Sequence, residues 1–216
     1  MTRTRRATVA MLLVGLAIFS SLYSTQAILP MLVQDMGLSS TEAAMTVSAA
    51  TGALALCVVP ASILSERFGR GRILLISAVS ATSVGLIVPL AAEGWHLILL
   101  RGLQGALLSG APATAMAWLS EELDDKALPR AMGLYIAGTS VGGLTGRLIP
   151  TGLVEISTWR WALFGSALVS LSFAITSWLL LPAQRNFRPK SIHLTSESRA
   201  LFGHWANRDL ALLFLT

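Results

Sequence analysis

Long apolar runs separated by short polar breaks dominate the chain. A helix that spans a bilayer needs about 20 mostly apolar residues, and six segments meet that length: residues 7–29, 43–64, 73–92, 97–119, 131–152 and 161–181. The breaks between them are short, and the longest covers residues 30–42. The pattern predicts an all-α, polytopic membrane protein in which residues 1–181 form a bundle of six transmembrane helices.

A polar stretch over residues 182–207 follows the sixth run, and we expect it to be a cytoplasmic central loop. The apolar pattern returns within residues 208–216, where it climbs only about 10 Å of a hydrocarbon core about 30 Å thick. We therefore expect the beginning of a seventh transmembrane helix, in a piece of a longer membrane protein or a truncated reading frame. Aligning Met45 with Met132 gives a faint match between the first and second three spans, which favours a 3+3 repeat only weakly.

The composition excludes an ordinary soluble enzyme. Hydrophobic residues make up 54% of the sequence and charged residues 12%, against roughly 45–50% and about 25% in soluble domains. The net charge of +5 could indicate nucleic acid, but the basic residues lie in short strings between apolar runs and form no basic face. The partner that this pattern predicts is the lipid bilayer, with no nucleic acid. One cysteine and three scattered histidines predict neither a disulfide, a metal site nor another cofactor.

The distribution of Lys and Arg predicts a cytoplasmic N-terminus. If the first residues lie inside the cell, all but three of the 16 Lys and Arg residues fall on the cytoplasmic side, as the positive-inside rule requires. The exceptions are Arg160 outside and Arg101 and Arg147 within spans. The first run could instead be a secretory signal, but its length and the five later spans favour an uncleaved helix.

A short basic loop after the second span carries the first motif. Residues 62–72 read SILSERFGRGR and resemble the signature loop of the major facilitator superfamily, GxxxDRxGRR, with Ser62 in place of Gly and Glu66 in place of Asp. The resemblance implies a gating loop made of Glu66, Arg67, Gly69, Arg70 and Arg72. The alternative is a plain positive-inside loop. A later acidic run, residues 121–125, is either solvated or a partner for these arginines.

Polar side chains inside the spans predict a cavity. Residues 101–105 read RGLQG and resemble the RxxQG motif of the same family, which implies that Arg101 and Gln104 serve proton coupling or substrate recognition. The alternative for Arg101 is that it snorkels to the outer interface. Tyr23 and Gln26 share one helix face, so they line the cavity or form interhelical hydrogen bonds.

The fifth span combines glycines with an arginine. Its Gly138, Gly142, Gly143, Gly146 and Arg147 resemble the antiporter signature GxxxGPxxGG, with Gly143 in place of Pro and Arg147 in place of the last Gly. The alternative is a helix-packing stripe, which explains the glycines equally well but leaves Arg147 unexplained. We therefore add Arg147 to the predicted coupling and substrate cavity.

Taken in order, the three motifs resemble the N-terminal half of a facilitator of the YnfM-type bacterial inner-membrane branch. The resemblance implies a multi-pass inner-membrane transporter that exports a small solute by alternating access, with the proton as coupling ion and proton antiport as the coupling. Its partner would be a missing C-terminal half or a second copy. No acid lies deep within a span, because Asp35, Glu42, Glu93 and Glu155 fall at boundaries.

Two other readings are a non-transporting truncated half and a six-span structural or assembly protein. An intramembrane enzyme is disfavoured, because the spans contain no nucleophile with a base and no paired acids.

Overall fold

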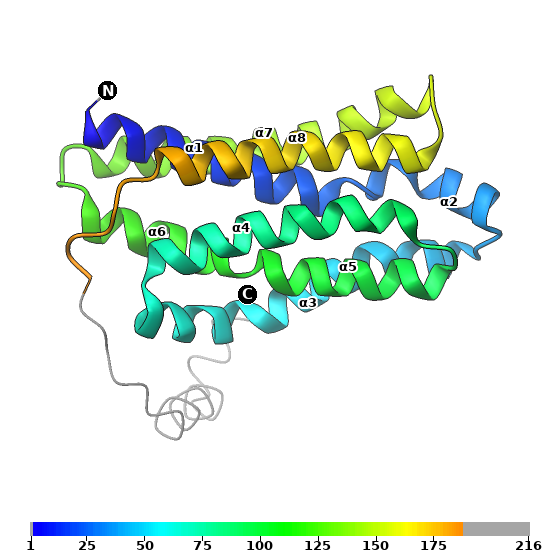
Figure 1. The fold of residues 1–216 in the computed structure, drawn as a ribbon, viewed down its shortest axis with the longest axis horizontal. Helices are drawn as coiled ribbons and strands as arrows, with labels where there is room; N and C mark the ends of the chain where they lie inside the picture. The colour runs from blue at the N-terminus through cyan, green and yellow to red at the C-terminus, as the bar shows by residue number, and fades with distance from the viewer. Residues whose placement is uncertain (1, 188–216) are drawn as a thin grey trace, which may run out of the picture.

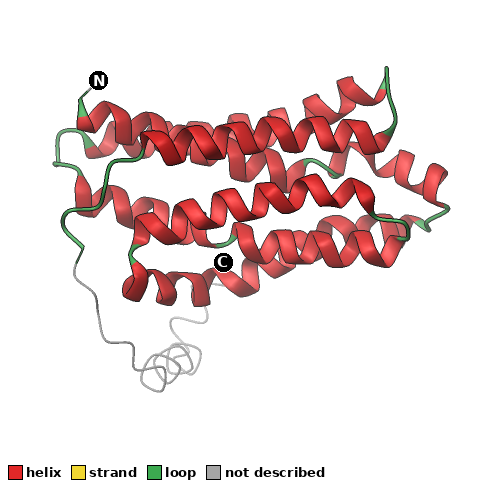
Figure 2. Ribbon diagram, in the orientation of Figure 1, coloured by secondary structure: helices red, strands yellow, loops and turns green. Residues whose placement is uncertain are grey.

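A computed structural model describes residues 2–187, and within this range the chain forms ten helices and no strand. The helices run along the long axis of the molecule, as Figures 1 and 2 show. In chain order they are α1 (Arg3–Tyr23), η1 (Gln26–Ile28), α2 (Leu29–Met36), α3 (Ser40–Phe68), α4 (Arg70–Ile87), η2 (Val88–Leu90), α5 (Gly94–Leu108), α6 (Gly110–Glu122), α7 (Leu128–Val154) and α8 (Trp159–Leu180). The predicted seventh helix and nearly all of the central loop lie outside the described residues.

The break expected at residues 30–42 is mostly helical, so that expectation was wrong. Helix α2 occupies residues 29–36, because Pro30 lies in its first turn, where a missing N–H costs nothing. Gly37 then adopts a φ of 67° and ends the helix. Ser39 and Glu42 form a reciprocal capping box that begins α3. Only a short connection is left between the first two predicted spans.

The fourth predicted span is divided into α5 and α6 at Ser109. Pro112 cannot donate a backbone hydrogen bond to the carbonyl of Leu108, and its ring crowds that carbonyl. The Ser109 amide donates to the carbonyl of Ala106, three residues earlier, at 3.4 Å. In a regular α-helix it would donate to the carbonyl four residues earlier. The run is therefore interrupted at Ser109, where α5 ends and α6 begins.

Four stretches in the described part of the chain are long and apolar enough to cross a membrane: residues 3–36, 40–68, 70–90 and 159–180. Helices α5 and α6 have 15 and 13 residues, so each alone is shorter than a span. Helix α7 has 27 residues but is rich in glycine. The all-α membrane fold is confirmed, and the number of six spans stays a prediction.

The helices form two groups that meet where α8 and α1 pack against α4. Helices α1, α7 and α8 lie along one side of the bundle and α3 to α6 along the other (Figure 1). The buried core contains apolar side chains such as Met11, Val14, Ile18 and Trp118. Large apolar side chains also cover the outside, and Leu56 and Leu179 are 79% and 69% exposed. An apolar exterior of this kind fits a bilayer.

Candidate functional site

Arg101 lies in the interior of the bundle and is fully buried. Helix α1 ends at Tyr23, and the last carbonyls of a helix have no amide partner within it. Arg101 donates to two of these carbonyls, that of Ser21 at 3.1 Å and that of Leu22. The partial negative charge at the C-terminal end of α1 thus faces the guanidinium. Snorkelling to the outer interface is excluded by this burial.

Gln104 completes the network around Arg101. Its Oε1 accepts a hydrogen bond from Arg101 Nη1 at 2.5 Å, and its Nε2 donates to Ser21 Oγ at 2.8 Å and to the carbonyl of Ala81 at 3.2 Å. Arg101 Nε also reaches the carbonyl of Thr46 on α3 at 3.5 Å. No carboxylate pairs with Arg101 among residues 2–187. Carbonyls and one amide therefore surround this charge and join α5 to α1, α3 and α4.

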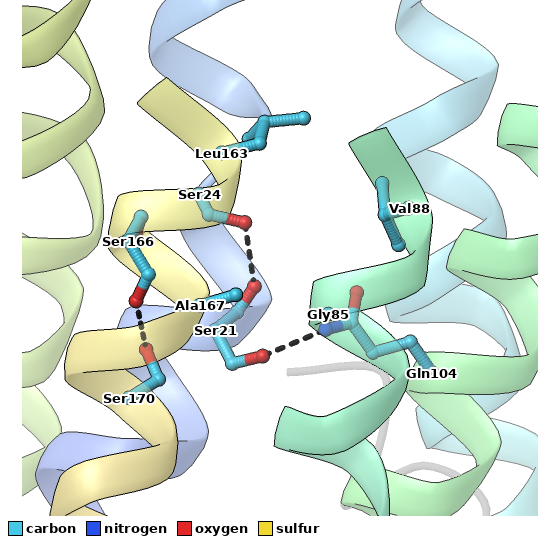
Figure 3. A pocket seen from close by; sticks show the side chains of 9 residues that line it. All are labelled: Ser21, Ser24, Gly85, Val88, Gln104, Leu163, Ser166, Ala167 and Ser170. Carbon is cyan, nitrogen blue, oxygen red and sulfur yellow. Dashed lines mark hydrogen bonds between the residues drawn. The ribbon is translucent and has the colours of Figure 1, made fainter. Parts of the chain in front are cut away.

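A small polar pocket borders this network. Figure 3 shows Gln104 and Ser21 on one side of it and Ser166 and Ser170 of α8 on the other. The pocket has a volume of about 10 Å³, which is room for about one water molecule. Ser166 Oγ is buried without a hydrogen-bond partner in the described part of the chain. The pocket is thus suited to a water and is too small for an organic solute.

Arg147 on α7 forms a second, exposed cluster with Tyr23 and Gln26. Its Nε donates to Gln26 Oε1 at 2.9 Å, its Nη1 donates to the carbonyl of Gly143 at 2.8 Å, and its guanidinium lies 4.2 Å from the centre of the Tyr23 ring. The five predicted cavity residues thus separate into two groups. Arg101 and Gln104 lie inside the bundle, whereas Arg147 and Gln26 are exposed and Tyr23 is half-buried. The end of α1 lies between the two groups.

The glycines of α7 bring this helix against α1. A Cβ at Gly142 would lie 2.8 Å from the Gly15 carbonyl oxygen, and one at Gly146 would lie 2.6 Å from that of Ser20. A Cβ at Gly138 would overlap the carbonyl of Leu12. Gly143 differs, because it faces the Tyr23 ring and Arg147 Nη1 at 3.5 and 3.6 Å. Three glycines therefore touch the backbone of α1, and the fourth borders the Arg147 cluster.

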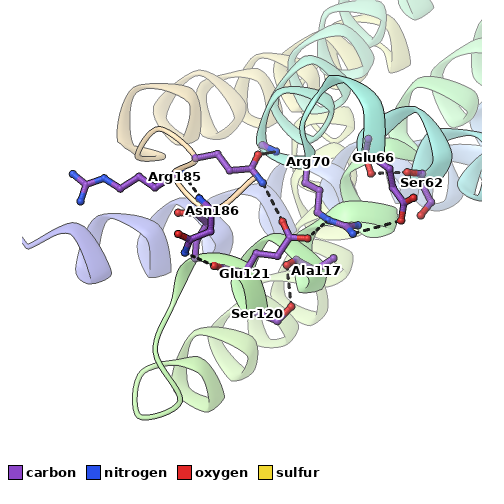
Figure 4. Close-up of polar contacts among 12 residues, drawn as sticks. Ser62, Glu66, Arg70, Ala117, Ser120, Glu121, Arg185 and Asn186 are labelled. Carbon is purple, nitrogen blue, oxygen red and sulfur yellow. Dashed lines mark hydrogen bonds and ion pairs between the residues drawn. The ribbon is translucent and has the colours of Figure 1, made fainter. Parts of the chain in front are cut away.

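The predicted gating loop lies at the opposite end of the bundle. Arg70 Nε contacts Glu121 Oε1 at 2.6 Å, and Arg70 Nη2 lies 3.7 Å from Glu66 Oε1 (Figure 4). Gly69, with a φ of 100°, forms the turn between α3 and α4, a conformation that disfavours side chains. Arg70 thus joins this turn to the end of α6. From the sequence we considered residues 121–125 as a partner for the loop arginines, and Glu121 is such a partner.

The other two basic residues of the loop are exposed. The Arg67 guanidinium lies 5.4 Å from the centre of the Phe68 ring. Arg72 lies on the surface two residues beyond Arg70. Among the charged residues of the loop, Glu66 and Arg70 share a contact.

Glu122 is the main residue that sequence reasoning missed. Its side chain is completely buried and accepts hydrogen bonds from Arg3 Nη2 at 2.5 Å and from the backbone amides of Arg185 and Asn186, both at 2.8 Å. Burial raises the pKa of Glu122, but the hydrogen bonds from Asn186, Arg3 and Arg185 outweigh it and leave the pKa below its ordinary value. Its place in an acidic run was the only signal in the sequence.

Comparisons with known proteins place the chain in a transporter family. The family model of the Major Facilitator Superfamily matches residues 11–216. The chain is 36% identical over 210 residues to the Inner membrane transport protein YnfM of Escherichia coli (strain K12), and the match covers 97% of this chain and 50% of that protein. It is 33% identical over 211 residues to the Uncharacterized MFS-type transporter YybF of Bacillus subtilis (strain 168), covering 98% and 52%. The chain spans about half the length of these relatives.

The fold is similar to that of a solved transporter. The structure is titled a bacterial homolog to human lysosomal transporter Spinster, in an inward-facing and occupied conformation, and it aligns with a TM-score of 0.70 at 18% identity. The alignment covers 86% of this chain and 46% of that chain. At this identity the likeness concerns the fold alone.

Proposed function

This chain belongs to the major facilitator superfamily, a family of membrane transporters and not of enzymes, and we propose that it supplies the N-terminal half of a secondary transporter. A second half, on the same polypeptide or on a second copy, would close against it so that a solute site opens to each side of the membrane in turn.

The observation that carries the proposal is the buried Arg101. Placing a charged side chain inside a membrane bundle costs free energy, and residues of this kind usually have a function. Here the guanidinium holds the C-terminal end of α1 in place through Ser21 and Leu22. The next residue, Tyr23, belongs to the exposed cluster around Arg147. Arg101 is thus a positioning residue for the part of α1 that would face the solute.

The charges at the two ends of the bundle support a cytoplasmic N-terminus. Contacts of Glu121 and Glu122 bring Arg3, Arg70 and Arg185 to one end, whereas Arg160 lies at the other. The excess of arginine at the first end is what the positive-inside rule assigns to the cytoplasm. Bacterial relatives, one of them named an inner membrane transport protein, support a place in the bacterial inner membrane.

Proton-coupled export is the coupling that we favour. It rests on the glycines of α7, which resemble the antiporter pattern of the family and bring α7 against α1. No Asp or Glu lies deep within the described spans, so the proton would bind a group on the second half. A pH gradient imposed on proteoliposomes should then drive solute movement. A rate of solute movement that does not depend on the pH gradient would contradict antiport.

Replacement of Arg101 tests the transporter itself. In the native protein that carries this chain, Arg101→Ala should abolish gradient-driven movement of a broad solute panel and leave membrane insertion intact. Arg101→Lys keeps the charge but cannot reach both α1 carbonyls and Gln104 together, so it should retain only a small part of the activity. Arg160→Gln removes an exposed arginine and serves as the matched control. Unchanged transport in Arg101→Ala would refute the proposed role.

A further inference from the structure

The exposed cluster of Arg147 carries an inference about the solute. Arg147 lies seven residues before the end of α7 at Val154, which is about 10 Å along the helix. A snorkelling arginine would extend toward that end. Instead, Nη1 turns back to the carbonyl of Gly143, one helical turn in the opposite direction. The side chain therefore points back along α7, within the predicted fifth span and away from the end of the helix.

Three neighbours fix the guanidinium but do not neutralise it. The carbonyl of Gly143, the amide of Gln26 and the ring of Tyr23 are all uncharged. An arginine has five N–H groups, and these two hydrogen bonds leave three without a partner in the described part of the chain. None of the ion pairs among residues 2–187 includes Arg147. The cluster thus carries a positive charge and has hydrogen-bond donors that no described residue occupies.

The two departures of α7 from the antiporter pattern meet in this cluster. Gly143 stands where the pattern has proline, and Arg147 stands where it has its last glycine. A Cβ at position 143 would already touch the Tyr23 ring at 3.5 Å and Arg147 Nη1 at 3.6 Å. A larger side chain at this position would compete with the guanidinium for that space. The glycine at 143 and the arginine at 147 are therefore complementary, and together they form one site.

The surface around Arg147 suits an amphiphilic partner. Ser140, Leu144, Arg147 and Thr151 follow one another at spacings of three or four residues and are all exposed, so they share one face of α7. A polar stripe with an apolar member beside a guanidinium fits an organic molecule better than an inorganic ion. A guanidinium pairs most strongly with a carboxylate, through two parallel hydrogen bonds.

We propose that Arg147, held by Gly143, Tyr23 and Gln26, binds the carboxylate of a small organic anion that the transporter moves. The proposal rests on the proposed transport function. The carboxylate would supply the counter-charge that the described residues do not offer and would accept the free N–H groups of Arg147. Neutral and cationic analogues of the same solute would leave the charge uncompensated and be rejected.

The test uses the native protein that carries this chain, purified and reconstituted in liposomes. The probes are acetate, lactate, succinate and benzoate, each paired with its uncharged amide, and benzylamine as the cation. We expect gradient-driven movement of at least one carboxylate and not of its amide. Arg147→Gln should weaken the apparent affinity for that carboxylate about tenfold or more, since a hydrogen-bonded charge pair is lost. Arg147→Lys should fall between the two, because it keeps the charge but not the planar pair of donors.

Arg160→Gln is the matched control, because it removes the same charge at a place that faces the carbonyls of Pro89 and Ala91 and not the Arg147 cluster. It should transport the carboxylate as the wild type does. Movement of amides or benzylamine alone, or unchanged carboxylate affinity in Arg147→Gln, would overturn the anion proposal and leave the transport function standing. If no solute of this or a broader panel follows a gradient, the transport function fails as well.

Discussion

Glu122 should hold the segment after α8 against the end of the bundle. The substitution Glu122→Gln removes the negative charge and keeps the size of the side chain. The buried carboxylate accepts from Arg3 and from the amides of Arg185 and Asn186, whereas the Gln side chain has only one acceptor oxygen and directs an NH₂ group at a donor. We therefore expect residues 182–187 to detach more readily in this variant.

The magnitude follows from the number of hydrogen bonds. A bond to a charged group contributes about 1.5–3 kcal/mol, and the glutamine keeps part of the network, so a net loss of about 2 kcal/mol is reasonable. This corresponds to roughly a 30-fold rise in the population of the detached form. Amide hydrogen exchange of residues 182–187 measures that population, because local opening controls exchange there. Asp125→Asn removes an exposed charge from the same run and is the matched control.

The pH dependence supplies a second measurement on the same residue. Because the pKa of Glu122 is below its ordinary value of 4.5, its contribution is complete above that value and is lost as the pH falls through the lowered pKa. Relative to the intrinsic exchange rate at each pH, the protection of residues 182–187 should therefore fall in the wild type below about pH 4.5, and this fall should be missing in Glu122→Gln. Equal exchange in both proteins at neutral pH, within twofold, would refute the reasoning.

Three shorter predictions concern helix contacts and the gating loop. Gly142→Ala should lower the unfolding free energy by about 1–3 kcal/mol through overpacking against α1, whereas Gly152→Ala, where the added Cβ meets nothing, should be neutral or stabilising in thermal unfolding. Gly69→Ala should cost about 1–3 kcal/mol in the same assay, because its φ of 100° is strained for a side chain; stability like that of Gly152→Ala would contradict this. A double-mutant cycle of Arg70→Gln and Glu121→Gln should give a coupling energy of about 1 kcal/mol or less, since both side chains are partly exposed, and additivity would mean that the ion pair contributes nothing.

The length of the apolar runs predicted the helical membrane fold, and each of the six runs is mostly helical in the described residues. It failed where local backbone chemistry decides the outcome. Pro30 begins α2, although a proline in a sequence break suggests a loop, and Pro112 divides an apolar run that looks continuous. Length and hydropathy average over such positions, so they cannot show on which side of a proline the helix lies.

Sequence spacing could show which residues are unusual but not where their partners lie. Arg101 and Gln104 are three residues apart, so their contact follows from the helix repeat. Two other acceptors of Arg101 are carbonyls of α1, some 80 positions away, and a backbone carbonyl cannot be recognised as an acceptor from the sequence. The contacts of Glu122 could not be predicted for the same reason, since two of its three partners are backbone amides.

The end of α1 connects the two arginines of the spans. Because Arg101 holds the carbonyls of Ser21 and Leu22 from inside, and Tyr23 lies under Arg147 on the outside, a shift of this end must disturb both guanidinium groups. Arg101 and Arg147 have only uncharged partners among residues 2–187. A carboxylate bound at Arg147 would therefore bring a full negative charge to the end of α1. Binding of the solute could then bias the position of α1 without any titratable group in this half. On this argument, loss of Arg101 should weaken carboxylate binding at Arg147 even though the two side chains do not touch.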